Sequence, residues 1–252
     1  MPDTIRDLGA LARSLAWEGG LLSRATADDL RAIAPSLRRR RFGRGDVLIE
    51  AGTPAPLAYF VERGVASVIR PAAGDRATEI CLIGPEGFVG SSIVMGEGRS
   101  PYRTLVQCDQ LNAFAVEASA LRALFDRSTS FRRLILSAIE AQTVQISETL
   151  VATLWHQIQA RLARWLLMYR ERLGSDRLEI THEFISLMIG AQRPKVTATV
   201  HELEGAGAIT ATRGLIVIRD AGLLEKLAGG SYVDRGRTGQ PITAETVAAS
   251  HG

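Results

Sequence analysis

Six polar side chains between residues 192 and 201 have the spacing of a helix that presents hydrogen-bond donors on one side. Arg193, Thr197 and His201 recur at every fourth residue and would form one stripe on a helix surface. This stripe is flanked by Gln192, Lys195 and Thr199. An arginine can bond a guanine edge through two parallel hydrogen bonds, and Gln or Thr can reach a base or a phosphate. The residue types therefore suit contacts in the major groove of DNA.

Two short helices separated by a glycine break are predicted to position this stripe. Thr181 can cap a helix over residues 182–189, and Gly190 lies where the backbone must bend sharply. A second helix is expected from Arg193, with Pro194 in its first turn, where a missing N–H removes no hydrogen bond. The predicted buried face of this helix consists of Val196, Val200 and Leu203. Such an arrangement is typical of a helix-turn-helix, and the alternative is an αα-hairpin inside a core.

A predicted β-hairpin directly after the second helix favours the first of these readings. Short strands are expected at 208–212 and 215–218, on either side of a turn formed by Arg213 and Gly214. A hairpin in this position is a wing, and Arg213 at its tip could contact a phosphate. The predicted DNA-binding residues are Gln192, Arg193, Lys195, Thr197, Thr199, His201 and Arg213.

A long helix is predicted upstream, because residues 131–155 contain neither Gly nor Pro. Ser128 and Ser130 are candidate N-caps for it. Alternating steps of three and four residues give it the spacing of a coiled-coil seam. The seam consists of Leu136, Ile139, Thr143, Ile146, Leu150 and Thr153. We expect this helix to pair with a second copy of the chain; the alternative is a helix that packs only on its own barrel.

From Phe42 to about Val116 the pattern changes to short apolar runs separated by glycines. Such runs predict the strands of an antiparallel barrel or sandwich. The expected strands contain residues 47–49, 59–61, 65–69, 79–83 and 104–106. The four arginines at 38–41, just before this region, are predicted to form a solvated loop edge, with a phosphate-contacting patch as the alternative.

The composition excludes several classes of protein. A net charge of +3 is compatible with a nucleic-acid partner but does not require one. Cys81 and Cys108 are too few for a disulfide framework or a zinc site, and we expect both to be small buried residues, with a redox pair as the alternative. Neither a signal peptide nor a membrane span is recognisable, so the protein is predicted to be cytoplasmic.

The sequence also lacks the patterns of an enzyme. We find no carboxylate pair, nucleophile motif, metal-ligand spacing or phosphate-binding glycine loop followed by a helix. We therefore expect neither catalysis nor a cofactor.

The order of barrel, long helix, helix-turn-helix and wing resembles the Crp/Fnr family of bacterial regulators. The likeness covers about residues 20–228 and rests on the local motifs at 45–52, 57–64, 84–90 and 181–190. It implies an α+β fold in which residues 1–127 form a double-stranded, jelly-roll-like β-roll that acts as a sensor. A dimerisation helix at 128–155 and a winged helix-turn-helix at 156–229 would follow, and the aperiodic residues 230–252 are predicted to be a flexible tail.

The resemblance also implies partners. A member of this family would act as a homodimer on a palindromic operator in double-stranded DNA, contact RNA polymerase, and respond to a small-molecule effector in the β-roll. Another possibility is a cyclic-nucleotide receptor in which DNA binding is secondary. The candidate effector pocket contains Gly90, Ser91, Arg99, Ser100 and Arg103.

Departures from the family pattern bear on the effector. Relatives that bind cyclic AMP have a glutamate where this chain has Ser91, and a serine cannot supply a charged acceptor. Arg99 and Ser100 resemble the pair that holds the cyclic phosphate, but Pro101 follows them and Arg103 could compete. We therefore predict a member that does not bind cyclic AMP, with its effector unidentified.

Other family sensors and the usual operator are also disfavoured. The first 80 residues contain no cysteine for an iron–sulfur cluster, and the four histidines, at 156, 182, 201 and 251, lie outside the predicted barrel. In the reading helix, Arg193 matches the family's base-reading arginine. Pro194 stands where relatives often have a glutamate and Ala198 where they have a second arginine, so a different operator is expected.

Overall fold

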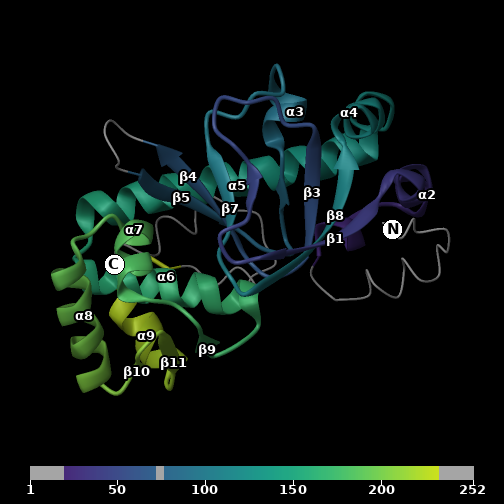
Figure 1. Ribbon diagram of the computed structural model, residues 1–252. Coiled ribbons are helices and arrows are strands. Elements are labelled where there is room, and N and C mark those ends of the chain that lie inside the picture. The colour runs from purple at the N-terminus through teal and green to yellow at the C-terminus, as the bar shows by residue number, and fades with distance from the viewer. Residues whose placement is uncertain (1–19, 72–76, 233–252) are drawn as a thin grey trace. The chain divides into compact units, whose positions relative to one another are not determined.

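The computed structural model of the chain describes residues 20–71 and 77–232 (Figure 1). Residues 1–19 of the predicted β-roll domain and residues 233–252 of the predicted tail lie outside this range. The contacts divide the chain into two compact units, Met1–Thr149 and Leu150–Gly252. The four-part division expected from the sequence stays a prediction.

Two antiparallel sheets of four strands form the described part of the first unit. In spatial order, the first sheet contains β1 (Arg38–Gly43), β8 (Gln110–Glu117), β3 (Leu57–Arg63) and β6 (Phe88–Val89). The second contains β2 (Val47–Ile49), β7 (Arg103–Val106), β4 (Ala66–Pro71) and β5 (Ala77–Ile83). Most neighbouring strands are distant in the sequence, as in a jelly roll, and the predicted α+β fold with a double-stranded β-roll is confirmed.

The arginine run provides one correction, because the predicted loop edge at residues 38–41 is the edge strand β1. This strand pairs with β8 from Arg38 opposite Ala115 to Gly43 opposite Gln110. The apolar β8 lies between β1 and β3, and its backbone groups need partners on both sides, which outweighs the weak strand propensity of arginine. Arg39 then forms a two-point ion pair with Glu62 of β3, at 2.8 and 2.7 Å.

Helices close one end of this roll, where α2 and α4 pack together (Figure 1). The described helices of the unit are η1 (Leu21–Arg24), α2 (Ala27–Ile33), η2 (Ala34–Ser36), α3 (Ser91–Met95), α4 (Ala118–Arg127) and α5 (Thr129–Trp155). Thr26 caps α2, accepting a hydrogen bond from the Asp29 N–H. The predicted long helix is confirmed as α5, which Ser128 caps through the Phe131 N–H at 3.2 Å.

The carboxylate of Asp29 joins α2 to the start of α5. It is buried and accepts hydrogen bonds from Ser128, from Ser130 at 2.6 Å and from Thr26 at 2.7 Å. Burial acts to raise the pKa of this carboxyl, but the three hydroxyl donors outweigh burial and hold the pKa below its usual value. The beginning of α5 is thus fixed on the first unit.

One face of α5 packs on the β-roll. Near its start, Phe131 meets Phe60 of β3 edge-on, with 6.4 Å between ring centroids. Further along, Gln142 donates to the Phe88 carbonyl at 2.9 Å. Gln145 accepts from the Leu82 N–H at 2.9 Å and donates to the Leu82 carbonyl at 3.0 Å. A side-chain amide therefore satisfies both backbone groups of one residue in the edge strand β5.

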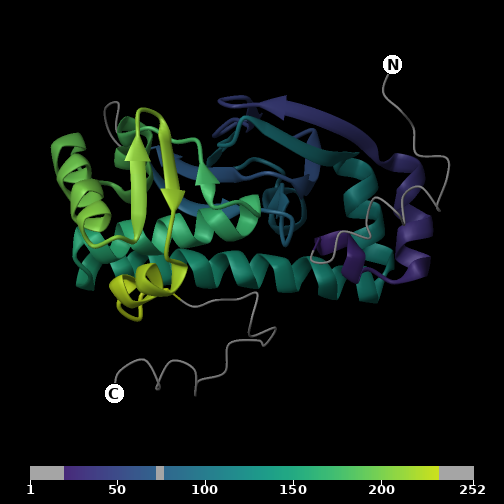
Figure 2. The ribbon, with the colours of Figure 1, turned by 90° about the horizontal axis from the view of Figure 1, so that it is seen from below.

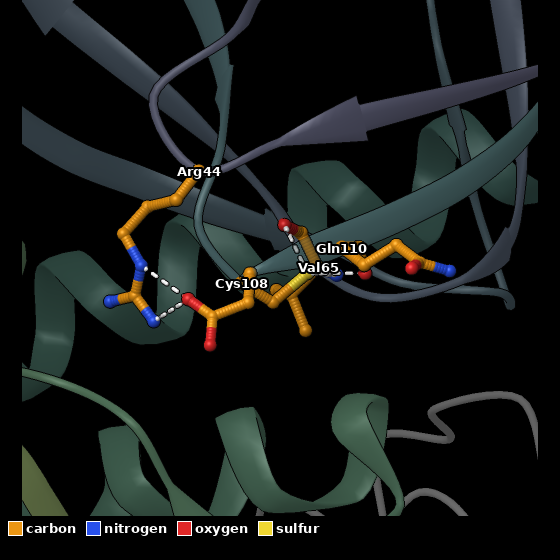
Figure 3. Close-up of polar contacts among 5 residues, drawn as sticks. Arg44, Val65, Cys108 and Gln110 are labelled. Atoms are coloured by element: carbon orange, nitrogen blue, oxygen red, sulfur yellow. Dashed lines mark hydrogen bonds and ion pairs between the residues drawn. The ribbon is translucent and has the colours of Figure 1, made fainter.

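Both cysteines are buried thiols outside any disulfide, which confirms the expected small buried residues. The sulfur of Cys108 accepts from the Val65 N–H at 3.2 Å, and its S–H donates to the Gln110 carbonyl at 3.1 Å (Figure 3). Burial raises the pKa of the Cys108 thiol. Beside this turn, Arg44 pairs with Asp109.

The second unit is a winged helix-turn-helix. Its described elements after the end of α5 are α6 (Ile158–Leu173), β9 (Arg177–Leu178), α7 (His182–Ile189), α8 (Arg193–Gly205), β10 (Ile209–Thr212), β11 (Leu215–Ile218) and α9 (Ala221–Ala228). The three strands form one sheet, in which β10 and β11 are the predicted wing hairpin (Figure 2). The helix α9 was not predicted from the sequence. Its local signal is the N-cap Asp220, which accepts from the Leu223 N–H at 2.8 Å.

Candidate nucleic-acid interface

The two helices of the helix-turn-helix begin and end at the predicted residues. Thr181 caps α7 by accepting from the Phe184 N–H at 3.2 Å. Gly190 ends it in the left-handed region, with φ of 61° and ψ of 42°, which glycine adopts at little cost. Arg161 of α6 donates to the Ile189 carbonyl, and burial lowers the pKa of this guanidinium. A cation on the last carbonyls of α7 opposes the negative end of its dipole and fixes the turn.

The inner face of α8 is apolar and is set against α6 and α7. Val196, Val200 and Leu203 are fully buried, which confirms the predicted inner face. On the neighbouring helices, Trp165 of α6 meets Phe184 of α7 edge-on, with 6.2 Å between ring centroids. The orientation of α8 about its own axis is therefore determined by packing.

The opposite side of α8 exposes the residues predicted to meet DNA. Gln192, Arg193 and Lys195 are all exposed. Across residues 20–71 and 77–232, neither Arg193 nor Lys195 forms a hydrogen bond or an ion pair through its side chain. Their donors are available for an external acceptor.

Thr199 is not on the exposed side of α8, where it was predicted from the sequence. Its side chain is 2% exposed, and its hydroxyl donates to the Lys195 carbonyl at 2.9 Å. The reason is its position: Thr199 is three residues after Val196 and four before Leu203, which puts it on the inner face. We therefore leave it out of the candidate interface.

Two further members of the stripe have partners inside the domain. Thr197 is half-buried, and its hydroxyl lies 3.0 Å from Nδ1 of His182 on α7. His201 is exposed, with Nδ1 3.6 Å from a carboxylate oxygen of Glu204. His182 was not predicted to belong to this site, because a contact between side chains fifteen residues apart leaves no local pattern in the sequence.

Arg213 lies exposed in the turn of the wing, beside Gly214. The wing is tied to the reading helix, because Glu204 of α8 accepts from the Ala211 N–H of β10 at 2.9 Å. Arg213 and the outer face of α8 thus belong to one connected substructure.

The candidate effector residues occupy two adjoining segments of the β-roll. Gly90 has φ of +119°, and a Cβ there would lie 3.0 Å from the Cβ of Ala58. Ser91 begins α3, and Gly98 donates back to the Ser92 carbonyl at 3.1 Å, which brings the following loop against this helix. Arg99 donates to the Gly52 carbonyl at 3.2 Å.

The other two effector candidates also have protein partners. The backbone carbonyl of Ser100 accepts from the Gly52 N–H at 2.7 Å, and its hydroxyl accepts from the Tyr102 N–H. Arg103 pairs with Glu50 at 3.3 Å. The two arginines that could hold a phosphate therefore already have acceptors in the protein.

The candidate seam of α5 is only partly exposed in the single chain. Leu150 is 59% exposed, whereas Ile139 is buried. Of the remaining positions, Leu136, Thr143 and Thr153 are exposed and Ile146 is half-buried. Leu154 and Trp155, which the heptad pattern did not select, are also exposed, Trp155 by 80%. An apolar stripe without cover is the property that a pairing helix needs.

Two searches over the described residues were negative. No group of three or more His, Cys, Asp and Glu side chains there could hold a metal ion. No helix within the same ranges has both the length and the apolarity to span a bilayer.

Comparison with known proteins agrees with this architecture. A family model of the cyclic nucleotide-binding domain matches residues 39–128, and one of the Crp-like helix-turn-helix domain matches residues 160–227. The chain is 27% identical over 202 residues to the cyclic AMP receptor protein of Thermus thermophilus, which covers 77% of this chain and 89% of that protein. It is 24% identical over 218 residues to the HTH-type transcriptional regulator Cmr of Mycobacterium tuberculosis, covering 84% and 86%.

A solved structure has the same fold. A transcriptional regulator of the CRP family from Thermus thermophilus matches with a TM-score of 0.65 at 19% identity, over 75% of this chain and 96% of that one.

The winged helix-turn-helix, with Arg193 and Lys195 exposed at the start of α8, defines a DNA-binding transcription regulator. A cyclic nucleotide-binding-type domain precedes it in the family's order, which supports a transcription regulator of the Crp/Fnr family. The name of the Mycobacterium tuberculosis relative describes a transcriptional regulator, and that of the Thermus thermophilus relative describes a receptor protein.

Proposed function

We propose that this regulator acts as a homodimer and reads a palindromic operator with one α8 helix per half-site. The observation that carries the proposal is the unpaired, exposed start of α8, where Arg193 and Lys195 have no acceptor among the described residues. Two such helices would enter successive major grooves about 34 Å apart. The proposed contacts come from Gln192, Arg193, Lys195, Thr197, His201 and Arg213.

Arg193→Ala is expected to weaken binding to the preferred operator by about 1–3 kcal/mol, or roughly 5- to 150-fold, because a base-edge contact is lost. The operator would be selected by the wild-type protein from a duplex library with a randomised core. Affinity would be measured by fluorescence anisotropy against this duplex and a random duplex of equal length.

Lys195→Ala provides the matched control, since Lys195 lies on the same turn and its contact is expected to be a phosphate. It should weaken both duplexes equally and reduce the salt slope by about one. Equal losses on both duplexes for Arg193→Ala would make Arg193 a phosphate contact. Absence of a preferred duplex would contradict sequence-specific binding.

Leu150→Glu is expected to shift the protein towards monomers, because it places two like charges in an apolar seam. Leu150 is already 59% exposed in the single chain, so the change should leave the fold intact. The molar mass would be measured by light scattering over a dilution series. Ala141→Glu adds the same charge at an exposed position outside the predicted seam and should leave the mass unchanged. An unchanged mass for Leu150→Glu would contradict the seam.

We further propose that the β-roll binds a small-molecule effector other than cyclic AMP. Support comes from Ser91 at the start of α3, whose hydroxyl is uncharged where relatives that bind cyclic AMP have a glutamate. Further support comes from Arg99 and Arg103, whose side chains already bond to acceptors in the protein and not to a phosphate. A contact with RNA polymerase and a cytoplasmic location follow from the role of a bacterial transcription regulator and belong to the same proposal.

A further inference from the structure

A histidine of the first helix touches the reading stripe of the second. His182 is the first residue of α7, and its Nδ1 lies 3.0 Å from the Thr197 hydroxyl on α8. Both side chains are half-buried, so this hydrogen bond is shielded from competing water. The rotamer of Thr197, a proposed DNA contact, is consequently determined by a residue outside the reading helix.

Positive charge surrounds this histidine. Burial lowers the pKa of His182, and the charges of His201 and Arg193 on α8 lower it further. On α7 itself, the adjacent Glu183 is exposed. The other packed helix, α6, presents Arg161 to the far end of α7, at the Ile189 carbonyl. Burial and the Arg193 guanidinium therefore favour the neutral form of His182 in the free protein.

The protonation state of His182 limits what Thr197 can offer to a base. A neutral imidazole can accept at Nδ1 from the Thr197 hydroxyl, which leaves only acceptor lone pairs facing outwards. A protonated imidazole must donate from Nδ1 to the Thr197 oxygen. The hydroxyl proton of Thr197 is then free to bond an acceptor on DNA, such as a phosphate oxygen, guanine O6 or thymine O4.

We propose that His182 is a positioning residue for DNA reading: a phosphodiester that approaches His182, Arg193 and His201 promotes protonation of His182, which turns the Thr197 hydroxyl outwards as a donor. This inference rests on the proposed function of α8 as the reading helix. The proton is taken up from solvent, and no covalent bond changes.

The expected direction of the pH dependence follows from the charges. The anionic phosphate offsets the nearby Arg193 charge and raises the pKa of His182 in the complex above its value in the free protein. Between these two pKa values, binding takes up a proton. Affinity therefore rises as the pH falls through this window and is independent of pH above it.

Four proteins would be compared in a His201→Gln background, which leaves His182 as the only imidazole of the helix-turn-helix. They are the parent, His182→Asn, His182→Phe and Thr197→Val. Asparagine retains a hydrogen-bonding group near the position of Nδ1 but does not titrate, whereas phenylalanine retains only the ring. Anisotropy would be measured from pH 5.5 to 8 at constant ionic strength, on the selected operator, on its single-base variants and on a random duplex.

The parent should gain affinity for the operator and for the random duplex as the pH falls, by up to about tenfold per pH unit for one proton. His182→Asn should lose this pH dependence and keep the base preference. His182→Phe should lose both. Thr197→Val should keep the pH dependence and lose the preference at one base pair.

Two results would overturn the inference: an unchanged pH dependence in His182→Asn, or an unchanged base preference in both His182→Phe and Thr197→Val. Failure of the parent to bind any duplex at any pH would instead contradict the proposed function. The two failures are thus distinguishable.

Discussion

Gly64→Ala is expected to lower the free energy of unfolding of the β-roll by about 2–5 kcal/mol, from backbone strain and overpacking together. Gly64 has φ of +104°, a region that favours glycine. An added Cβ would lie 2.8 Å from both the Cys108 sulfur and the Gln110 carbonyl oxygen, and 2.9 Å from the Leu111 Cα. Two of these three neighbours are backbone atoms, which cannot rotate away.

The third neighbour is equally restrained. The Cys108 sulfur is held between the Val65 N–H and the Gln110 carbonyl, as Figure 3 shows. A shift of the sulfur would break both contacts in a buried turn. The cost at Gly64 is therefore expected to be mainly steric.

Gly52→Ala is the matched control for Gly64→Ala. Gly52 has φ of +75°, but a Cβ there would have no atom within 4 Å, so only the backbone cost of about 1–2 kcal/mol is expected. Urea unfolding followed by circular dichroism would give both values, and hydrogen exchange would assign the loss to β3, β4 and β8. Equal costs at the two glycines would contradict the steric account.

Gln145→Leu is expected to destabilise the first unit by about 2–5 kcal/mol, because it removes the hydrogen-bond partners of two buried backbone groups at once. Gln145 is 4% exposed, and its amide bonds both the N–H and the carbonyl of Leu82. Leucine has a similar volume but no polar atom. Each unsatisfied group costs about 1–3 kcal/mol.

Gln142→Leu is the control for this second change. Gln142 is half-buried and donates a single hydrogen bond, to the Phe88 carbonyl, which water could replace. A loss of about 1 kcal/mol is expected. Faster exchange of the Leu82 amide in Gln145→Leu, but not in Gln142→Leu, would locate the effect. Equal stability of the two variants would mean that the two hydrogen bonds to Leu82 contribute no more than the single one made by Gln142.

Gln145 also links α5 mechanically to the β-roll. The helix α5 carries the proposed seam, and Gln145 holds it against the edge strand β5 of the sensor-type unit. Any change in the β-roll that moves β5 must either move α5 or break this pair of hydrogen bonds.

Local signals in the sequence were sufficient for the helix-turn-helix. Thr181, Gly190 and Pro194 act on the backbone within one turn, through a cap, a left-handed residue and a missing N–H. The inner face of α8 follows from the 3.6-residue period. The same period places Thr199 on that inner face, so its burial was available from the sequence and was overlooked.

Contacts between distant residues were decided only by the tertiary structure. The arginines at 38–41 form a strand because β8 requires a partner on that side. The heptad spacing predicted a seam, but Ile139 of that seam is buried, and Leu154, outside the seam, is exposed. The contact between His182 and Thr197 joins two helices whose relative orientation depends on the packing of α6. Caps and periodicity act over a few residues and can be read along the chain, whereas strand partners, covered faces and side-chain contacts depend on residues that only folding brings together.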